Sequence, residues 1–121
     1  MKYDDNNIFA KILRNEIPCN KIYEDDFVLS FYDINPQKKI HALVIPKGKY
    51  IDLDDFNTNA SNEEIIGFIK GISVVAKKLG ISSIDGKGYR ALANISDYGG
   101  QEVPHLHFHL FGGEKVGKMV T

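Results

Sequence analysis

The sequence lacks three features that would each indicate a particular class of protein. Cys19 is its single cysteine, so the chain forms neither an internal disulfide nor a thiolate zinc site, and an inert thiol in a reducing cytosol is expected. The formal net charge is −1, with lysines and acids mixed along the chain, which disfavours nucleic acid and anionic membranes as partners. Residues 1–7 are polar and acidic, unlike a signal peptide, and no apolar run approaches membrane-spanning length. We therefore expect a cytoplasmic protein.

The composition is ordinary for a globular protein. The chain has 121 residues, of which 43% are hydrophobic and 11% aromatic, enough for a two-layer core. No repeat, low-complexity tract or linker interrupts it. We expect residues 1–121 to form one domain.

Capping and turn residues divide the first half of the chain into a short helix and three strands. Asn6 or Asn7 caps the helix, and Pro18 follows its end. The strands are separated by Asp25-Asp26 and by Asn35-Pro36, and Pro46 stops the third one. The expected ranges are 8–14 for the helix and 22–24, 27–33 and 41–45 for the strands.

A long helix is expected between Ser61 and Leu79, where Ser61 and Glu64 form a capping box and Gly80 follows the C-terminal end. Two strands follow, one over residues 89–95 and one over the histidine-rich run near the C-terminus. This order predicts an α+β fold, an antiparallel sheet of about five strands with one long and one short helix packed on one side. The inner face of the long helix is expected to contain Ile65, Phe68, Ile69, Ile72, Val75, Ala76 and Leu79.

Three of the four histidines alternate with apolar residues in the run PHLHFHLF, residues 104–111. In an extended strand, side chains point alternately to opposite faces, so His105, His107 and His109 share one face while the apolar residues build core. At about 3.3 Å per residue, neighbouring imidazoles stand roughly 6.6 Å apart, a spacing that suits a phosphate or a metal ion.

Two chemistries use several imidazoles on one face. Three histidines can hold a catalytic zinc ion, but they would have to converge from a nearly straight strand, and Glu102 is the one acid near them. Alternatively, one imidazole attacks phosphorus and forms a covalent adduct, which requires neither metal nor cofactor. The glycine pairs at 99–100 and 112–113 favour this second reading, because glycine backbone can approach a charged ligand closely.

The chain resembles the histidine-triad family, and within it the Hint branch of nucleoside phosphoramidate hydrolases. The resemblance covers nearly the whole chain and follows the family's blocks in order. These blocks are IFAKI (8–12), EIP (16–18), YEDD (23–26), FYDINPQ (31–37), HALVIPK (41–47), GYR (88–90) and the run from GGQE (99–102) to GG (112–113).

The resemblance implies a role for each histidine. His107 would be the nucleophile on the α-phosphorus of a purine nucleotide derivative, and water would hydrolyse the nucleotidyl adduct. His109 would contact the phosphate and the leaving group. His105 and His41 would support them by hydrogen bonds that fix the tautomers.

The same resemblance implies a nucleotide pocket. Asp33 would bind the ribose hydroxyls, Asn94 and Gln101 the ribose or phosphate, and backbone near Val103 the phosphate oxygens. Glu102 stands where many eukaryotic relatives have a serine that assists the leaving group. In bacterial relatives a glutamate is common at this position. The residues around the base would be Ile8, Phe9, Ile12, Phe31, Tyr32, Ile34 and Leu43.

We therefore expect a homodimeric hydrolase of purine nucleoside phosphoramidates, with the sheets of two subunits continuing each other. The sequence ends at Thr121 without the longer tail that in some relatives reaches the partner's site, which leaves the leaving-group preference open. Two alternatives remain: a dinucleoside polyphosphate hydrolase with the same nucleophile, and a nucleotide-binding module whose hydrolysis is incidental.

Overall fold

A computed structural model describes residues 2–119; Met1 and the last two residues of the tail, Val120 and Thr121, lie outside the described part. Three helices and five strands are present among these residues. In chain order they are α1 (Ile8–Leu13), β1 (Lys21–Glu24), β2 (Val28–Tyr32), β3 (Ile40–Pro46), α2 (Leu53–Asn59), α3 (Asn62–Lys78), β4 (Arg90–Leu92) and β5 (Phe108–Gly112).

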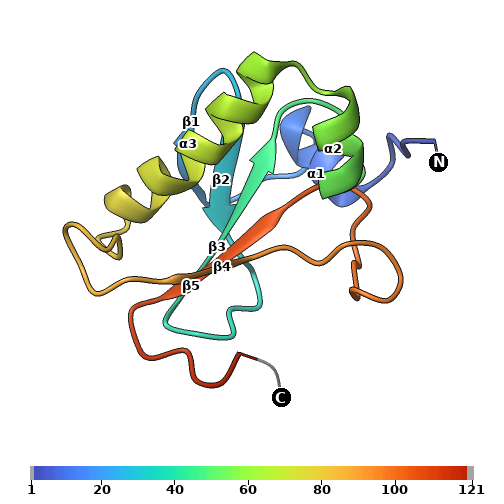
Figure 1. Cartoon of the computed structure of the whole chain (residues 1–121). Coiled ribbons are helices and arrows are strands. Elements are labelled where there is room, and N and C mark those ends of the chain that lie inside the picture. The colour runs from blue at the N-terminus through green and yellow to red at the C-terminus, as the bar shows by residue number, and fades with distance from the viewer. Residues whose placement is uncertain (1, 120–121) are drawn as a thin grey trace.

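The strands form one antiparallel sheet in the order β1-β2-β3-β5-β4. The α+β class and the five antiparallel strands are thus confirmed. Figure 1 shows the long helix α3 lying across the strands, and its contacts are with β1, β2 and β3. None of the helices in residues 2–119 combines the length and apolarity needed to cross a membrane.

The core on the α3 side of the sheet is built from alternate strand residues. Ala42 and Val44 of β3 face α3 and pack with Phe68, Ile72 and Val75 of that helix. The helix lies very close to the sheet at Gly71, where an added Cβ would stand 2.8 Å from a methyl group of Val28. The predicted capping box of Ser61 and Glu64 is confirmed at the start of α3.

A second core lies on the opposite face, where α1 packs. Phe9 and Ile12 of α1 contact the alternate residues of the central strands, Leu43 and Ile45 among them. The expectation that the helices share one side is therefore wrong. The physical reason is that β2 and β3 are buried on both faces, so the sheet needs a cover on each. Cys19 lies half-buried beside this core, and burial raises the pKa of its thiol, in keeping with an unreactive residue.

Two features of the helices differ from the sequence analysis. Helix α2 is not predicted, because Phe56 is its single buried residue and its sequence LDDFNTN has no helical apolar repeat. The expectation that Ile69 lies on the inner face of α3 is wrong, since its side chain is 53% exposed. It lies about 100° around the helix from Phe68, at the edge of the buried stripe.

The last two strands are shorter than expected. Strand β4 covers three residues, and β5 begins at Phe108, so His105 and His107 precede the strand in a segment outside the ladder. The apolar residues of the run nevertheless point to the α3 core, as Leu106 and Leu110 show. The predicted alternation between the two sides of the sheet is confirmed, although His105 and His107 are buried as well, and the uninterrupted straight strand is not confirmed.

Candidate active site

The four histidines gather on the α1 side of the sheet. His41 lies on β3, and His109 lies on β5 opposite Leu43 in the cross-strand register. The ring of His107 stands 5.1 Å from that of His109 and 4.9 Å from that of Phe9 on α1. Segments far apart in the sequence therefore bring all four imidazoles to one place.

His105 is a supporting residue, because both of its ring nitrogens are occupied. Its Nε2–H donates to the carbonyl oxygen of Pro46 at 2.9 Å, since a carbonyl can only accept. Its Nδ1 then accepts from the Tyr3 hydroxyl at 2.6 Å. The ring is fully buried, and burial lowers its pKa to about 4, which keeps it neutral at pH 7.

His107 presents a free nitrogen lone pair. Its Nδ1–H donates to the carbonyl oxygen of His105 at 2.7 Å, so Nε2 carries no hydrogen in the neutral ring. Among residues 2–119, Nε2 has no hydrogen-bond partner, and no buried side-chain nitrogen is left unpaired, so this atom is open to solvent. Burial of the ring lowers the pKa of His107, while the Asp33 and Glu102 carboxylates act in the opposite direction. The ring is therefore neutral at pH 7 and held in one orientation, with the lone pair of Nε2 available.

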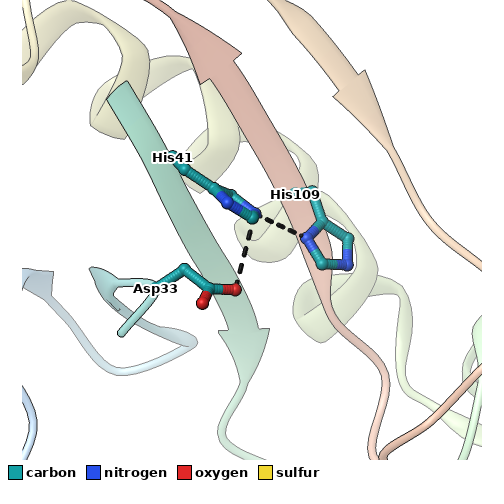
Figure 2. A group of neighbouring side chains, drawn as sticks. All are labelled: Asp33, His41 and His109. Atoms are coloured by element: carbon teal, nitrogen blue, oxygen red, sulfur yellow. Dashed lines mark hydrogen bonds and ion pairs between the residues drawn. The ribbon is translucent and has the colours of Figure 1, made fainter. Parts of the chain in front are cut away.

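His41 and His109 form a hydrogen-bonded pair with a fixed direction (Figure 2). The backbone N–H of Gln37 donates to His41 Nδ1 at 3.2 Å, so the hydrogen of His41 is on Nε2. That N–H donates to His109 Nδ1 at 2.9 Å, which leaves His109 with its hydrogen on Nε2. The pair therefore offers an N–H donor at its outer end.

Both rings of this pair are neutral at pH 7. Burial lowers the pKa of His41, and burial together with the neighbouring imidazoles lowers the pKa of His109 to about 4. The Asp33 carboxylate lies 3.5 Å from His41 Nε2 and opposes the shift of His41. At pH 7 the Asp33 carboxylate therefore makes a polar contact with a neutral His41 ring, because an ion pair would need a protonated His41.

Asp33, His41 and His109 could also be considered as metal ligands, because their ligand atoms lie within 4.8 Å of one another. The two facing nitrogens of the histidines already share a hydrogen at 2.9 Å, and a metal ion between them would have to replace it. The other set considered from the sequence, His105, His107 and His109, is unsuited, since both nitrogens of His105 are engaged. The arrangement fits imidazole chemistry on phosphorus better than a metal centre.

The residues expected around a base divide into a buried part and an exposed rim. Phe9 packs edge-on against Phe31, with ring centroids 5.7 Å apart. The Asp33 carboxylate accepts the backbone N–H of Asn35 at 2.8 Å with one oxygen and faces His41 with the other. Phe9, Ile12, Phe31 and Leu43 are buried, and Ile8, Tyr32 and Ile34 are exposed.

The loop before the histidines is held by the side chain of Gln101. Its amide nitrogen donates to the carbonyls of Ile51 and Val103 at 2.6 and 3.0 Å, and its oxygen accepts the N–H of Ser96 at 2.9 Å. The structure therefore engages Gln101 in positioning the loop. Val103 and Asn94 are half-buried, and Glu102 is exposed.

Sequence reasoning missed four groups that fix the imidazoles: the Tyr3 hydroxyl, the Pro46 and His105 carbonyls and the Gln37 backbone N–H. Three of them are backbone groups, which leave no trace in residue type. Tyr3 is separated from His105 by 102 residues. No local pattern links the two, and only a covariation between these positions could have found the contact.

Comparison with known proteins identifies the family of the chain. The HIT domain family model matches residues 14–116. A 13.2 kDa HIT-like protein of Azospirillum brasilense is 50% identical over 119 residues, covering 98% of this chain and 95% of the relative. The purine nucleoside phosphoramidase of Escherichia coli K12 is 40% identical over 117 residues, covering 97% of this chain and 95% of that enzyme.

A solved structure matches over almost the same extent. The HIT family hydrolase from Clostridium thermocellum has a TM-score of 0.85 and 36% identity, covering 98% of this chain and 99% of that one. Since the family model and these relatives span most of the sequence, the chain belongs to the histidine triad (HIT) family.

Proposed function

We propose that the protein hydrolyses purine nucleoside 5′-phosphoramidates at the phosphorus–nitrogen bond, as one HIT domain and without a cofactor. The observation that carries the proposal is the Nε2 atom of His107, whose lone pair is free and whose ring is held by the His105 carbonyl. The name of the Escherichia coli relative, purine nucleoside phosphoramidase, supports the class of substrate.

The reaction has two displacements. His107 Nε2 attacks phosphorus, the phosphorus–nitrogen bond breaks, and the departing nitrogen takes up one proton and leaves as an amine. The ring of the adduct is cationic, and the His105 carbonyl stabilises it by accepting its Nδ1–H. Water then attacks phosphorus, the bond to His107 breaks, and the nucleoside monophosphate and one proton are released.

The other proposed site residues bind and orient the nucleotide. The His109 Nε2–H donates to a phosphate oxygen, and His41 holds that ring in the required tautomer. Asp33 receives the ribose hydroxyls, and the base lies against the exposed rim of Ile8, Tyr32 and Ile34 above the buried residues. Asn94, Gln101, Glu102 and Val103 form the phosphate side, where Gln101 keeps the loop backbone in place.

The decisive experiment is to trap the adduct. Rapid quench of the wild-type protein with adenosine 5′-phosphoramidate should give a nucleotidyl adduct that mass spectrometry locates on His107. His107→Asn should form no adduct and lose at least about 10³-fold in kcat/KM, as expected when a covalent nucleophile is removed, while still binding the nucleotide. An adduct on another residue, or faster turnover of diadenosine triphosphate than of the phosphoramidate, would refute the proposal.

We also propose that the protein is a homodimer whose two sheets join through β4. That strand is the outer member of the sheet next to β5, and Ala91 at its centre is exposed. An unpaired edge strand has backbone groups available for pairing with another chain. Sedimentation should give a dimer, and Ala91→Pro, which removes one N–H donor, should weaken it; a monomer in the wild type would exclude this assembly.

A further inference from the structure

A hollow lies beside the histidines, on the side away from the base residues. Its volume is about 270 Å³. The lining residues come from the turn after β2, from β4 and β5, and from the segment after β5. They are Gln37, Lys38, Arg90, Leu92, Phe111 and Val116, and we call this site the Lys38–Arg90 hollow.

The hollow is adjacent to the proposed phosphate site. Leu92 is the cross-strand partner of His109, and Phe111 is the partner of Arg90, so these side chains share the histidine face of the sheet. The Phe111 ring lies parallel to that of His109 at 5.8 Å and stands 4.3 Å from His41. The hollow therefore lies on the His109 side of the proposed phosphate site, whereas the base residues lie toward β2 and α1.

The walls of the hollow carry positive charge. Two of the six lining residues, Lys38 and Arg90, are cationic and none is acidic. The Arg90 guanidinium is held in place, because it donates to the carbonyl oxygens of Gly117 and Lys118 at 2.8 and 3.0 Å. Within residues 2–119, three of its five N–H groups have no hydrogen-bond partner. Glu114, in the segment after β5, accepts the backbone N–H of Lys39 and does not line the hollow.

We propose that the Lys38–Arg90 hollow binds an anionic group on the leaving amine, so that nucleoside phosphoramidates of amino acids with a free carboxylate are the preferred substrates. This inference rests on the proposed function. A carboxylate matches the planar guanidinium and the ammonium group that line the hollow. The volume lies just below the 300–1,000 Å³ or so of sites for drug-sized ligands, which suits a small amino acid and not a second nucleoside.

The test compares three adenosine phosphoramidates that differ only in the leaving amine. The three amines are glycine with a free carboxylate, glycinamide, and aminomethylphosphonate. We expect the wild-type kcat/KM for the glycine compound to exceed that for glycinamide about tenfold, the effect of one charge-assisted contact. The phosphonate distinguishes a general anion site, which would accept both anions, from a site fitted to a carboxylate. The preference should weaken at high salt.

Matched variants locate the effect. Lys38→Gln should reduce the ratio of the two kcat/KM values by about threefold, as for one partly exposed charge pair. Arg90→Gln should reduce it further. Lys39→Gln removes the same charge from the neighbouring exposed residue outside the hollow and should leave the ratio unchanged.

Turnover of the glycinamide compound tests the proposed function. The ratio of the kcat/KM values for the glycine and glycinamide compounds tests binding of the carboxylate in the Lys38–Arg90 hollow. Equal kcat/KM values for glycine and glycinamide compounds, or an equal effect of Lys38→Gln and Lys39→Gln, would overturn the inference while leaving the hydrolase intact. Calorimetric binding of both compounds to His107→Asn applies the same comparison without turnover. Equal dissociation constants there would also overturn it.

Discussion

At the scale of single residues, the site depends on hydrogen bonds that each admit one direction. Backbone carbonyls fix the hydrogen of His105 on Nε2 and that of His107 on Nδ1. A backbone N–H fixes the hydrogen of His41 on Nε2. Because the rings are neutral and their tautomers set, His107 Nε2 carries a lone pair and no hydrogen, as the proposed attack on phosphorus requires.

Tyr3 is the residue in this network whose removal is easiest to interpret. Tyr3→Phe keeps the ring but leaves the buried Nδ1 of His105 without a donor, which we expect to lower the free energy of unfolding by about 1–3 kcal/mol. Tyr98→Phe removes the hydroxyl of a fully exposed tyrosine and should change the free energy of unfolding by less than about 0.5 kcal/mol. Chemical denaturation measures both. Equal effects would mean that the Tyr3 hydroxyl does not support His105.

At the scale of elements, the alternation of polar and apolar residues explains how one strand serves two purposes. Strand β3 sends Ala42 and Val44 to the α3 core, and its other face carries His41 with Leu43. The same division in the histidine run could be predicted from the sequence, because side-chain alternation depends only on extended backbone.

Gly71 tests how closely α3 must approach this sheet. In Gly71→Val the new Cβ would lie 2.8 Å from a methyl group of Val28, so we expect a loss of about 1–3 kcal/mol in the free energy of unfolding. Ser73→Val introduces the same side chain at an exposed position of α3 and serves as the control. Thermal unfolding of both variants decides the matter. Full stability of Gly71→Val would contradict the packing described here.

The parts of the fold that were not predicted leave no local apolar pattern in the sequence. Helix α2 is specified by its Asp52 cap and by Phe56, and it lacks an apolar repeat that a reader of the sequence could detect. The cover of the sheet by α1 on the opposite face depends on tertiary packing. Most residues of the candidate site came from motifs of the family, whereas Tyr3 and the backbone partners depend on contacts between distant segments.

At the scale of the whole molecule, burial of neutral histidines makes stability depend on pH. His105 has a pKa of about 4 in the folded protein and about 6.5 when unfolded, so the unfolded chain binds more protons between these values. Stability is therefore full above about pH 6.5 and falls as the pH drops toward 4. For the fully buried His105 alone, the loss is roughly 3 kcal/mol.

This acid dependence can be measured apart from that of the carboxylates. Carboxyl groups with lowered pKa values, such as Glu24 at about 2, affect stability mainly below about pH 4.5. Denaturant titrations at steps between pH 7.5 and 4.5 should show a steady decline that His105→Gln reduces. A flat profile in the wild type would show that the buried rings are protonated without cost.

The neutrality of the four imidazoles also bears on what happens after the proposed hydrolysis. A phosphoramidate monoester carries one negative charge on its phosphate, whereas the nucleoside monophosphate product approaches two at pH 7, since the second pKa of a phosphate is about 6. The rings offer N–H dipoles but no cation to balance the added charge, and Asp33 repels it. Repulsion of the finished nucleotide would clear the site for the next turnover, so accumulated product should inhibit the protein only weakly.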